Sequence, residues 1–350
     1  MVDQMTSEER FKALLKGEDL DRVPVIPFHF GHVGVVNGLS IADIYENAEL
    51  SFHAQSRAAE MYGYERLNAY GYAAFGAWEF GGEVKLPRGE GEAPTVLKHA
   101  VTTAEEALAL TLPDDIMAVG SMPIAWEFSK LQAEHGYPVT LQAVGPLDMA
   151  AGVMGVENVM VFMAECPEAL HHVCRVVTDF VLQSCDIWAK EFGGENLMPF
   201  CGYAVESNML ISPNHFEAFA LPYIKEVVEK INEVGAPNTY LHICADQIKN
   251  LPLYAQAPWP KKSIFTFGIE MSATTVAEHF PDHVICAPID PLLMYQGTPD
   301  EVLAQGKERI EEGKGVIPGF ALAPGCDIPA YSAPVNVYQM VKAAKLYGAY

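Results

Sequence analysis

Short apolar runs alternate with longer amphipathic stretches along most of the chain. Apolar runs bounded by Gly and Pro are typical of buried strands, whereas stretches with apolar residues three and four apart predict helices. The pattern predicts eight strands, at about residues 22–28, 66–70, 138–144, 196–201, 239–244, 263–269, 284–287 and 315–321.

Helices are predicted in the connections between these strands. The first begins at Thr6, which stands three residues before Glu9 in the spacing of a capping box. The others are expected at about residues 41–61, after Met149, after Pro167, and at 213–234, 299–312 and 336–345. A long insertion at 71–115, rich in Gly, Pro and Glu, predicts a small hairpin from residues 82–86 and 95–101.

Eight strands with helical connections predict an α/β fold of the TIM (β/α)8 barrel type, with residues 1–350 in a single domain. The alternative is a doubly wound open sheet. That alternative is disfavoured because no Gly-rich phosphate loop follows the first predicted strand.

Net charge and cysteine content indicate which binding partners and which cellular location to expect. The chain has 350 residues and a formal net charge of −23, so neither nucleic acid nor an anionic membrane surface is an expected partner. It has no apolar run of about 18 residues, the length that a membrane-spanning helix needs. The chain has seven cysteines and no C-x-x-C pair, which favours free thiols in a reducing cytoplasm. The acidic, polar N-terminus is unlike a signal peptide, which agrees with that location.

The candidate chemistry centres on His242 and Cys244 in the predicted strand 239–244. Side chains two apart on a strand point to the same side, so an imidazole and a thiol face the same space. Zinc binds both kinds of ligand, and Cys326 in a turn-rich segment is the candidate third ligand. Alternatively, His242 is a hydrogen-bonded core histidine and Cys244 a small buried apolar side chain.

The barrel topology strengthens the metal hypothesis. The active sites of such barrels lie at the C-terminal ends of the strands. His242 and Cys244 end one strand, Glu270 follows the next, and Cys326 lies a few residues past the last. All four are therefore expected at the same mouth of the barrel.

Several short motifs, in order and spacing, resemble the uroporphyrinogen decarboxylase superfamily over nearly the whole chain. They are Arg22-Val23-Pro24-Val25, Gly145-Pro146-Leu147, Leu210-Ile211-Ser212-Pro213, Phe219-Ala220-Leu221-Pro222-Tyr223, Asp290-Pro291, Gly297-Thr298-Pro299-Asp300-Glu301-Val302 and Val335-Asn336-Val337. The fold that this resemblance implies is the barrel predicted above.

The resemblance extends to one branch of that superfamily, the zinc methyltransferases that move methyl groups between corrinoid proteins and thiols such as coenzyme M. That branch has H-x-C after the fifth strand and a late Cys after the eighth, which His242, Cys244 and Cys326 match. The resemblance implies zinc at these residues, with Glu270 as a candidate fourth ligand. It also implies a corrinoid (methylcobalamin) carried by a partner protein. Ala245 departs from the Gly that usually follows the zinc Cys.

The decarboxylase branch is the alternative, with a tetrapyrrole as substrate. Its strand-one loop contains Arg residues that hold a polycarboxylate, whereas residues 29–36 here contain neither Arg nor Lys. A second alternative is a non-catalytic corrinoid-binding module. For the methyltransferase we expect a small thiol or methylated substrate, with His29, His32, Glu206 and Asn208 as candidate substrate contacts. Loop histidines are more often solvated or hydrogen-bonded to backbone, and Glu206 and Asn208 could equally be ordinary polar loop residues.

Overall fold

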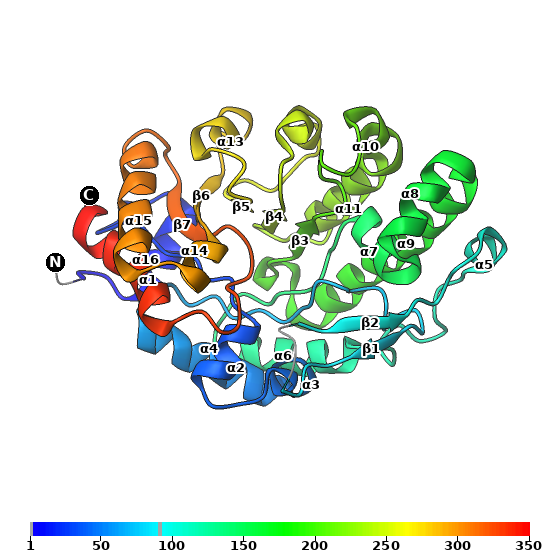
Figure 1. Cartoon of the computed structure of the whole chain (residues 1–350), viewed down its shortest axis with the longest axis horizontal. Coiled ribbons are helices and arrows are strands. Elements are labelled where there is room, and N and C mark those ends of the chain that lie inside the picture. The colour runs from blue at the N-terminus through cyan, green and yellow to red at the C-terminus, as the bar shows by residue number, and fades with distance from the viewer. Residues whose placement is uncertain (1–2, 90–92) are drawn as a thin grey trace.

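The computed structural model describes residues 3–89 and 93–350 and forms a barrel of parallel strands inside a ring of helices (Figure 1). Five regular strands pair in sequence order. They are β3 (Phe200–Tyr203), β4 (Tyr240–Ile243), β5 (Ile264–Phe267), β6 (Val284–Ile289) and β7 (Phe320–Pro324). Every residue of β4 to β7 is buried, as expected for parallel strands covered on both faces.

Two further predicted strands extend this sheet through short pairings. Val25 pairs in parallel with Leu322 of β7, and the amide of Ile26 donates to the Leu322 carbonyl at 2.8 Å. At the other edge, Val139 and Gln142 pair in parallel with the chain at and just before β3. The predictions at 22–28 and 138–144 therefore place extended chain correctly, although neither segment forms a continuous ladder.

The prediction of a strand at 66–70 is wrong, because this segment has no regular strand pairing. Side chains make much of the closure instead. The side-chain amide of Gln142 donates to the Tyr70 carbonyl at 2.6 Å, and the Gln55 amide exchanges two hydrogen bonds with the backbone of Ala69. The amide of Glu65 donates to the Val25 carbonyl at 3.1 Å. The barrel is thus closed across a seam held largely by polar side chains.

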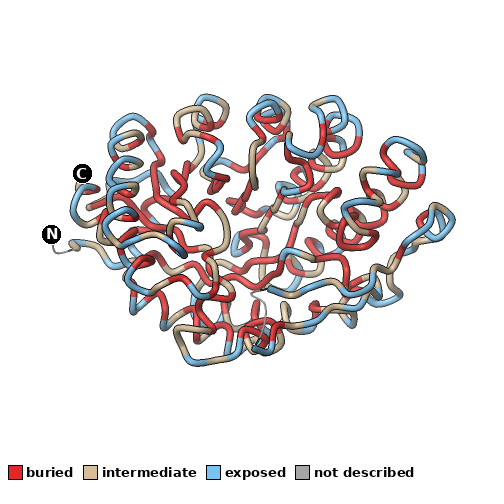
Figure 2. Tube along the Cα trace, viewed as in Figure 1, coloured by how far each residue is buried: buried red, intermediate tan, exposed pale blue. Residues whose placement is uncertain are grey.

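The outer layer consists of helices that cover the strands, and Figure 2 shows burial concentrated on the inner side of this ring. The longer helices are α1 (Ser7–Lys16), α4 (Ala48–Tyr62), α6 (Met122–Glu134), α7 (Pro146–Met154), α8 (Val156–Glu165), α9 (Pro167–Phe192), α11 (Leu221–Glu233), α15 (Pro299–Gly313) and α16 (Pro334–Tyr347). The shorter ones are α2 (Gly31–Val36), α3 (Ile41–Glu46), α5 (Ala104–Ala109), α10 (Pro213–Phe219), α12 (Leu251–Tyr254), α13 (Ala273–His279) and α14 (Pro291–Gln296).

Local capping decides where several of these helices begin. The predicted capping box of Thr6 and Glu9 is present at the start of α1. The predicted helix at 41–61 is divided at Asn47, whose side chain accepts from the Leu50 amide at 2.9 Å and starts α4. The predicted helix at 213–234 is divided at Ala220, close to Pro222 in the first turn of α11.

The predicted hairpin is confirmed as β1 (Glu83–Lys85) and β2 (Thr95–Lys98), which pair antiparallel. Across the residues that the structure describes, no single helix has the length and apolarity to cross a bilayer. Only α7 and α8 together reach that test, and they meet at a bend of 108°.

Candidate metal centre

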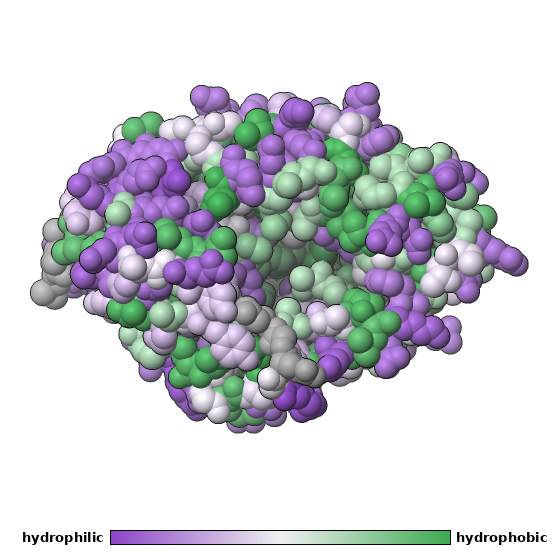
Figure 3. All heavy atoms as spheres, viewed as in Figure 1, coloured by the Kyte–Doolittle hydropathy of each residue, from purple (hydrophilic) through white to green (hydrophobic). Residues whose placement is uncertain are grey.

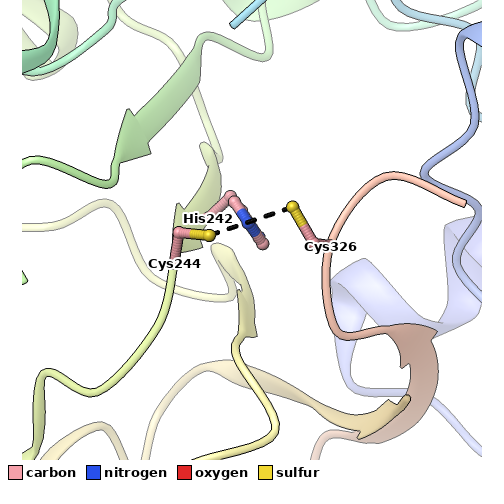
Figure 4. A group of neighbouring side chains, drawn as sticks. All are labelled: His242, Cys244 and Cys326. Carbon is pink, nitrogen blue, oxygen red and sulfur yellow. Dashed lines mark hydrogen bonds between the residues drawn. The ribbon is translucent and has the colours of Figure 1, made fainter. Parts of the chain in front are cut away.

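The three predicted metal ligands come together at the C-terminal mouth of the barrel (Figure 4). His242 lies in β4, Cys244 follows the end of that strand, and Cys326 lies just past β7. One ligand atom from each lies within 4.8 Å of the others, and the two sulfur atoms are 3.8 Å apart. The amide of Cys244 donates to the Tyr203 carbonyl at 2.8 Å, which continues the sheet hydrogen bonding to the ligand itself.

The hydrogen bonding of His242 leaves one ring nitrogen available as a ligand. The Thr266 hydroxyl donates to the Leu241 carbonyl at 3.1 Å, so it accepts from the Nδ1–H of His242 at 3.0 Å. Nε2 then carries the lone pair, and it is buried without a hydrogen-bond partner in the described part of the chain. The ring also packs on Phe28, with centroids 5.0 Å apart. A metal-binding imidazole is typically oriented by such a bond to its other nitrogen.

The two thiols share one hydrogen bond. A hydrogen bond from the Cys326 thiol lowers the pKa of Cys244, and the same bond, together with burial, raises the pKa of Cys326. A divalent cation would neutralise the charge of two thiolates and would accept the lone pair of His242 Nε2. Two cysteine sulfurs and one imidazole nitrogen are a zinc ligand set that leaves a fourth position for substrate. The residues present therefore fit zinc.

The turn after Cys244 has an unusual backbone. Ala245 adopts the left-handed region with φ 58°, which costs a non-glycine residue about 1–2 kcal/mol. The Gln247 side chain holds this turn by donating to the carbonyls of Tyr203 and Cys244, at 2.8 and 3.1 Å. The neighbouring Gly268 has no space for a side chain, since a Cβ there would stand 2.8 Å from the Ala245 amide nitrogen. The fold thus retains a strained turn where Gly would adopt the conformation readily.

Glu270 is not drawn into the cluster. Its side chain is exposed beside Gly268, and the group of ligand atoms that the described residues form comprises His242, Cys244 and Cys326. Its role as a fourth ligand remains a prediction.

A cavity of about 180 Å³ opens beside the cluster, and Figure 3 shows the hollow at the centre of this face. Aromatic side chains form much of its wall: Phe28, Phe30, Tyr45, Tyr72, Phe200 and Tyr203. Gln142, Asp148 and Asp327 add polar groups that the sequence analysis did not assign to the site. Each of these three lies in or just after a segment that ends at the mouth. That position in the sequence could have marked them as candidate site residues.

The four candidate substrate contacts lie outside the lining of this cavity. His32 is fully buried and uses both ring nitrogens, with the Ala330 carbonyl at 3.2 Å and the Tyr62 hydroxyl at 2.7 Å. His29 is buried against the ring of Tyr64, and burial lowers its pKa to about 3. Both histidines are thus part of the barrel wall, and their role as substrate contacts stays a prediction.

The two candidates after β3 support the mouth from behind. Asn208 binds the side chain of Asn250 at 2.9 Å and accepts from the Lys249 amide at 3.0 Å, which joins the loops after β3 and β4. Glu206 is fully buried, and burial together with the neighbouring Asp148 raises its pKa well above the usual range. Burial raises the pKa of the Asp148 carboxyl as well.

The fold and this site define a (β/α)8 barrel with a His-Cys-Cys cluster at its mouth. Residues 6–347 match the family described as uroporphyrinogen decarboxylase (URO-D). The chain belongs to this family, as the sequence motifs predict.

Similar proteins point to one activity within the family. Two proteins named methylcobamide:CoM methyltransferase MtbA, from Methanosarcina acetivorans and Methanosarcina mazei, are 24% and 23% identical, and each alignment covers 99% of both chains. A methylated-thiol–coenzyme M methyltransferase from Methanosarcina mazei is 26% identical over 75% of this chain and 67% of its own. All three relatives are named as methyltransferases that involve coenzyme M, two with a methylcobamide and one with a methylated thiol.

Solved structures confirm the fold. A methyltransferase from Methanosarcina mazei superposes with a TM-score of 0.81 at 22% identity, covering 98% of this chain and 99% of the other. A B12-independent methionine synthase from Shewanella superposes with a TM-score of 0.52 at 10% identity, covering 85% and 87% of the two chains. Both comparisons place the chain among TIM barrels.

Proposed function

We propose that this protein is a zinc-dependent methyltransferase that moves a methyl group between a corrinoid on a partner protein and a small thiol. The observation that carries the proposal is the buried Nε2 of His242, which lacks a hydrogen-bond partner within the described residues and lies beside two cysteines at the barrel mouth. The methyltransferase names of the relatives support the same reaction class.

The residues divide the work as follows. His242, Cys244 and Cys326 would hold zinc, and Thr266 would keep the imidazole in the binding tautomer. When bound, zinc would supply a Lewis acid that keeps a substrate thiol in its thiolate form. In the direction from corrinoid to thiol, the thiol would release its proton to solvent on binding and its sulfur would gain the methyl group. The corrinoid would keep the electron pair of the carbon–cobalt bond that breaks. The aromatic wall keeps water from the reacting sulfur.

The cavity disfavours the decarboxylase alternative. Its volume of about 180 Å³ is below the ~300–1,000 Å³ of pockets that take drug-sized ligands, so a whole tetrapyrrole would remain above the mouth. A polycarboxylate would also meet Asp148 and Asp327 without a lysine or arginine among the described lining residues. The non-catalytic alternative keeps the same site but predicts binding without turnover.

The test is direct. Purified protein should contain about one zinc per chain by elemental analysis, and it should demethylate methylcobalamin only when a thiol is present, followed by the change in corrinoid absorbance. Zinc without turnover would favour the non-catalytic module. Decarboxylation of uroporphyrinogen at about 1 per second or faster would restore the decarboxylase interpretation.

Exposed apolar side chains lie in the segments that follow the regular strands and suit the docking of a partner. They follow five successive strands and form what we call the apolar rim: Met209, Leu210, Ile248, Ile269, Leu292 and Tyr331. Met209 is 72% exposed and Leu292 is 57% exposed. A group of exposed apolar side chains near a cavity is typical of a protein-binding surface, and a docked corrinoid protein would close the cavity to water.

A charged side chain in this apolar rim should weaken the binding of the partner protein and leave the methyl-transfer step unchanged. We expect Leu292→Glu to raise the KM for the methylated corrinoid protein about tenfold, which corresponds to ~1.4 kcal/mol, because the carboxylate would have to be desolvated in the interface. Transfer from free methylcobalamin should change by less than about twofold. Val316→Glu is the matched control, since Val316 is 69% exposed but lies between α15 and the N-terminal end of β7. Equal effects of both variants would argue against docking at the rim.

A further inference from the structure

The cavity beside the cluster offers no positive charge to a substrate. The described residues that line it include no Lys or Arg, while Asp148 and Asp327 both contribute carboxylates. Arg88 lies in the same connection as the lining residue Ala93, but it is exposed and paired with Glu46. An anionic substrate would therefore find repulsion where it needs a counter-charge.

Backbone hydrogen bonds hold the two carboxyl groups in place at the wall of the cavity. Asp148 accepts from the amides of Ala204 and Val205, at 2.7 and 3.2 Å. Asp327 accepts from the Phe30 amide at 2.8 Å. Zinc bound by two thiolates would be neutral overall, so it would bring no net positive charge to the cavity.

The remaining wall suits a cation as well. Six aromatic side chains line the cavity: Phe28, Phe30, Tyr45, Tyr72, Phe200 and Tyr203. The faces of aromatic rings attract ammonium groups, most strongly where water is excluded. Aromatic faces together with fixed carboxylates are a combination that recognises a small organic cation.

We propose that the substrate of this site is a small thiol, or its S-methyl form, that carries a cationic amine at its other end. The inference rests on the proposed function, because the sulfur is placed at the cluster. The volume of about 180 Å³ favours a short aliphatic molecule. The substrate would then differ in charge from coenzyme M, the anionic thiol for which the relatives are named.

Three thiols of matched length separate charge from size. They are 2-aminoethanethiol, 2-mercaptoethanol and 2-mercaptoethanesulfonate, and their dissociation constants for the zinc-loaded protein can be measured by calorimetry without any turnover. We expect the aminothiol to bind at least about tenfold more tightly than the sulfonate, with the neutral thiol between them.

The three thiols differ in acidity, which also affects their dissociation constants. Comparing the same thiols between protein variants removes this influence. In Asp148→Asn, the ratio of the sulfonate to the aminothiol dissociation constant should fall about tenfold, because the thiols are unchanged and a carboxyl group is replaced by a neutral amide. Asp327→Asn serves the same purpose if the first variant does not fold, since an amide oxygen can also accept from the Phe30 amide. Asp290→Asn is the control: this carboxylate caps α14 near the mouth but lies outside the cavity lining.

The outcomes are distinguishable. A sulfonate that binds as tightly as the neutral thiol, or a ratio unchanged in both Asp148→Asn and Asp327→Asn, would overturn the charge inference while leaving zinc methyl transfer intact. Failure of all three thiols to bind the zinc-loaded protein would overturn the proposed function, and the charge inference with it. Zinc content and circular dichroism of each variant show whether the fold and the cluster are preserved.

Discussion

Replacing Cys244 with serine should remove most of the zinc and lower methyl transfer by more than about 100-fold. Cys244 is one of three ligands, and its sulfur stands 3.8 Å from that of Cys326. A serine hydroxyl ionises far less readily than a thiol and is a poor zinc ligand at neutral pH, so the site would keep one imidazole and one thiolate. Cys326→Ser should behave alike, because both variants break the same cluster. Zinc per chain by elemental analysis checks the expectation.

Two controls separate ligand loss from general damage. Cys166→Ser makes the same chemical change at a partly exposed cysteine before α9 and should keep the full zinc content. Glu270→Gln should keep most of the zinc, since Glu270 is exposed outside the cluster, yet it should alter thiol affinity if this carboxylate occupies the fourth position at rest. Full zinc content in both Cys244→Ser and Cys326→Ser would show that the metal, if any, binds elsewhere.

The geometry of the cluster could be predicted because it follows from two regular rules. The period of two along a strand puts His242 and Cys244 on one side, and the topology of the barrel brings the ends of all strands to one mouth. Cys326 joins them for the second reason alone. Neither rule requires knowledge of side-chain contacts, so the sequence was sufficient for this part of the site.

The polar residues around the cluster could not be ranked in the same way. His32 and Asn208 stand after strands as Asp148 does, but their partners, Tyr62 and Asn250, come from other elements. Which polar side chain faces the cavity and which binds a neighbouring loop depends on these tertiary contacts. Asp148 lies in the first turn of α7, where an acidic residue is already explained by the helix. Its position in the sequence therefore did not indicate that it also lines the cavity.

The same limit explains why the strand predicted at 66–70 does not form. The segment 64–72 contains Glu65, Asn68 and several bulky aromatic residues, and their tertiary contacts decide how it joins the barrel. The structure uses the polar side chains as substitutes for a ladder. The carboxylate of Glu65 accepts from the Val25 amide, and the side-chain amide of Gln132 donates to the Asn68 carbonyl at 2.7 Å.

Glu65→Gln should therefore lower the free energy of unfolding by about 3–5 kcal/mol, the cost typical of removing one partner from a buried ion pair. Glu65 is fully buried and lies 2.8 Å from Arg10 and 3.5 Å from Arg22, both also buried. Burial raises the pKa of Glu65, and the two guanidinium groups oppose that shift. A glutamine would leave these charges with less compensation and would present an amide where an acceptor is needed. The midpoint of urea unfolding at unchanged slope measures the loss.

Glu8→Gln supplies the matched control, because Glu8 makes an exposed pair with Lys12 on α1 and should contribute less than about 0.5 kcal/mol. Hydrogen exchange adds a local measurement. If Glu65 holds the seam closed, the amide of Val25 should exchange faster in Glu65→Gln, while the amides of β5, on the regular part of the sheet, change only with global stability. Equal loss of protection at both places would mean that Glu65 stabilises the barrel as a whole without any special part in its closure.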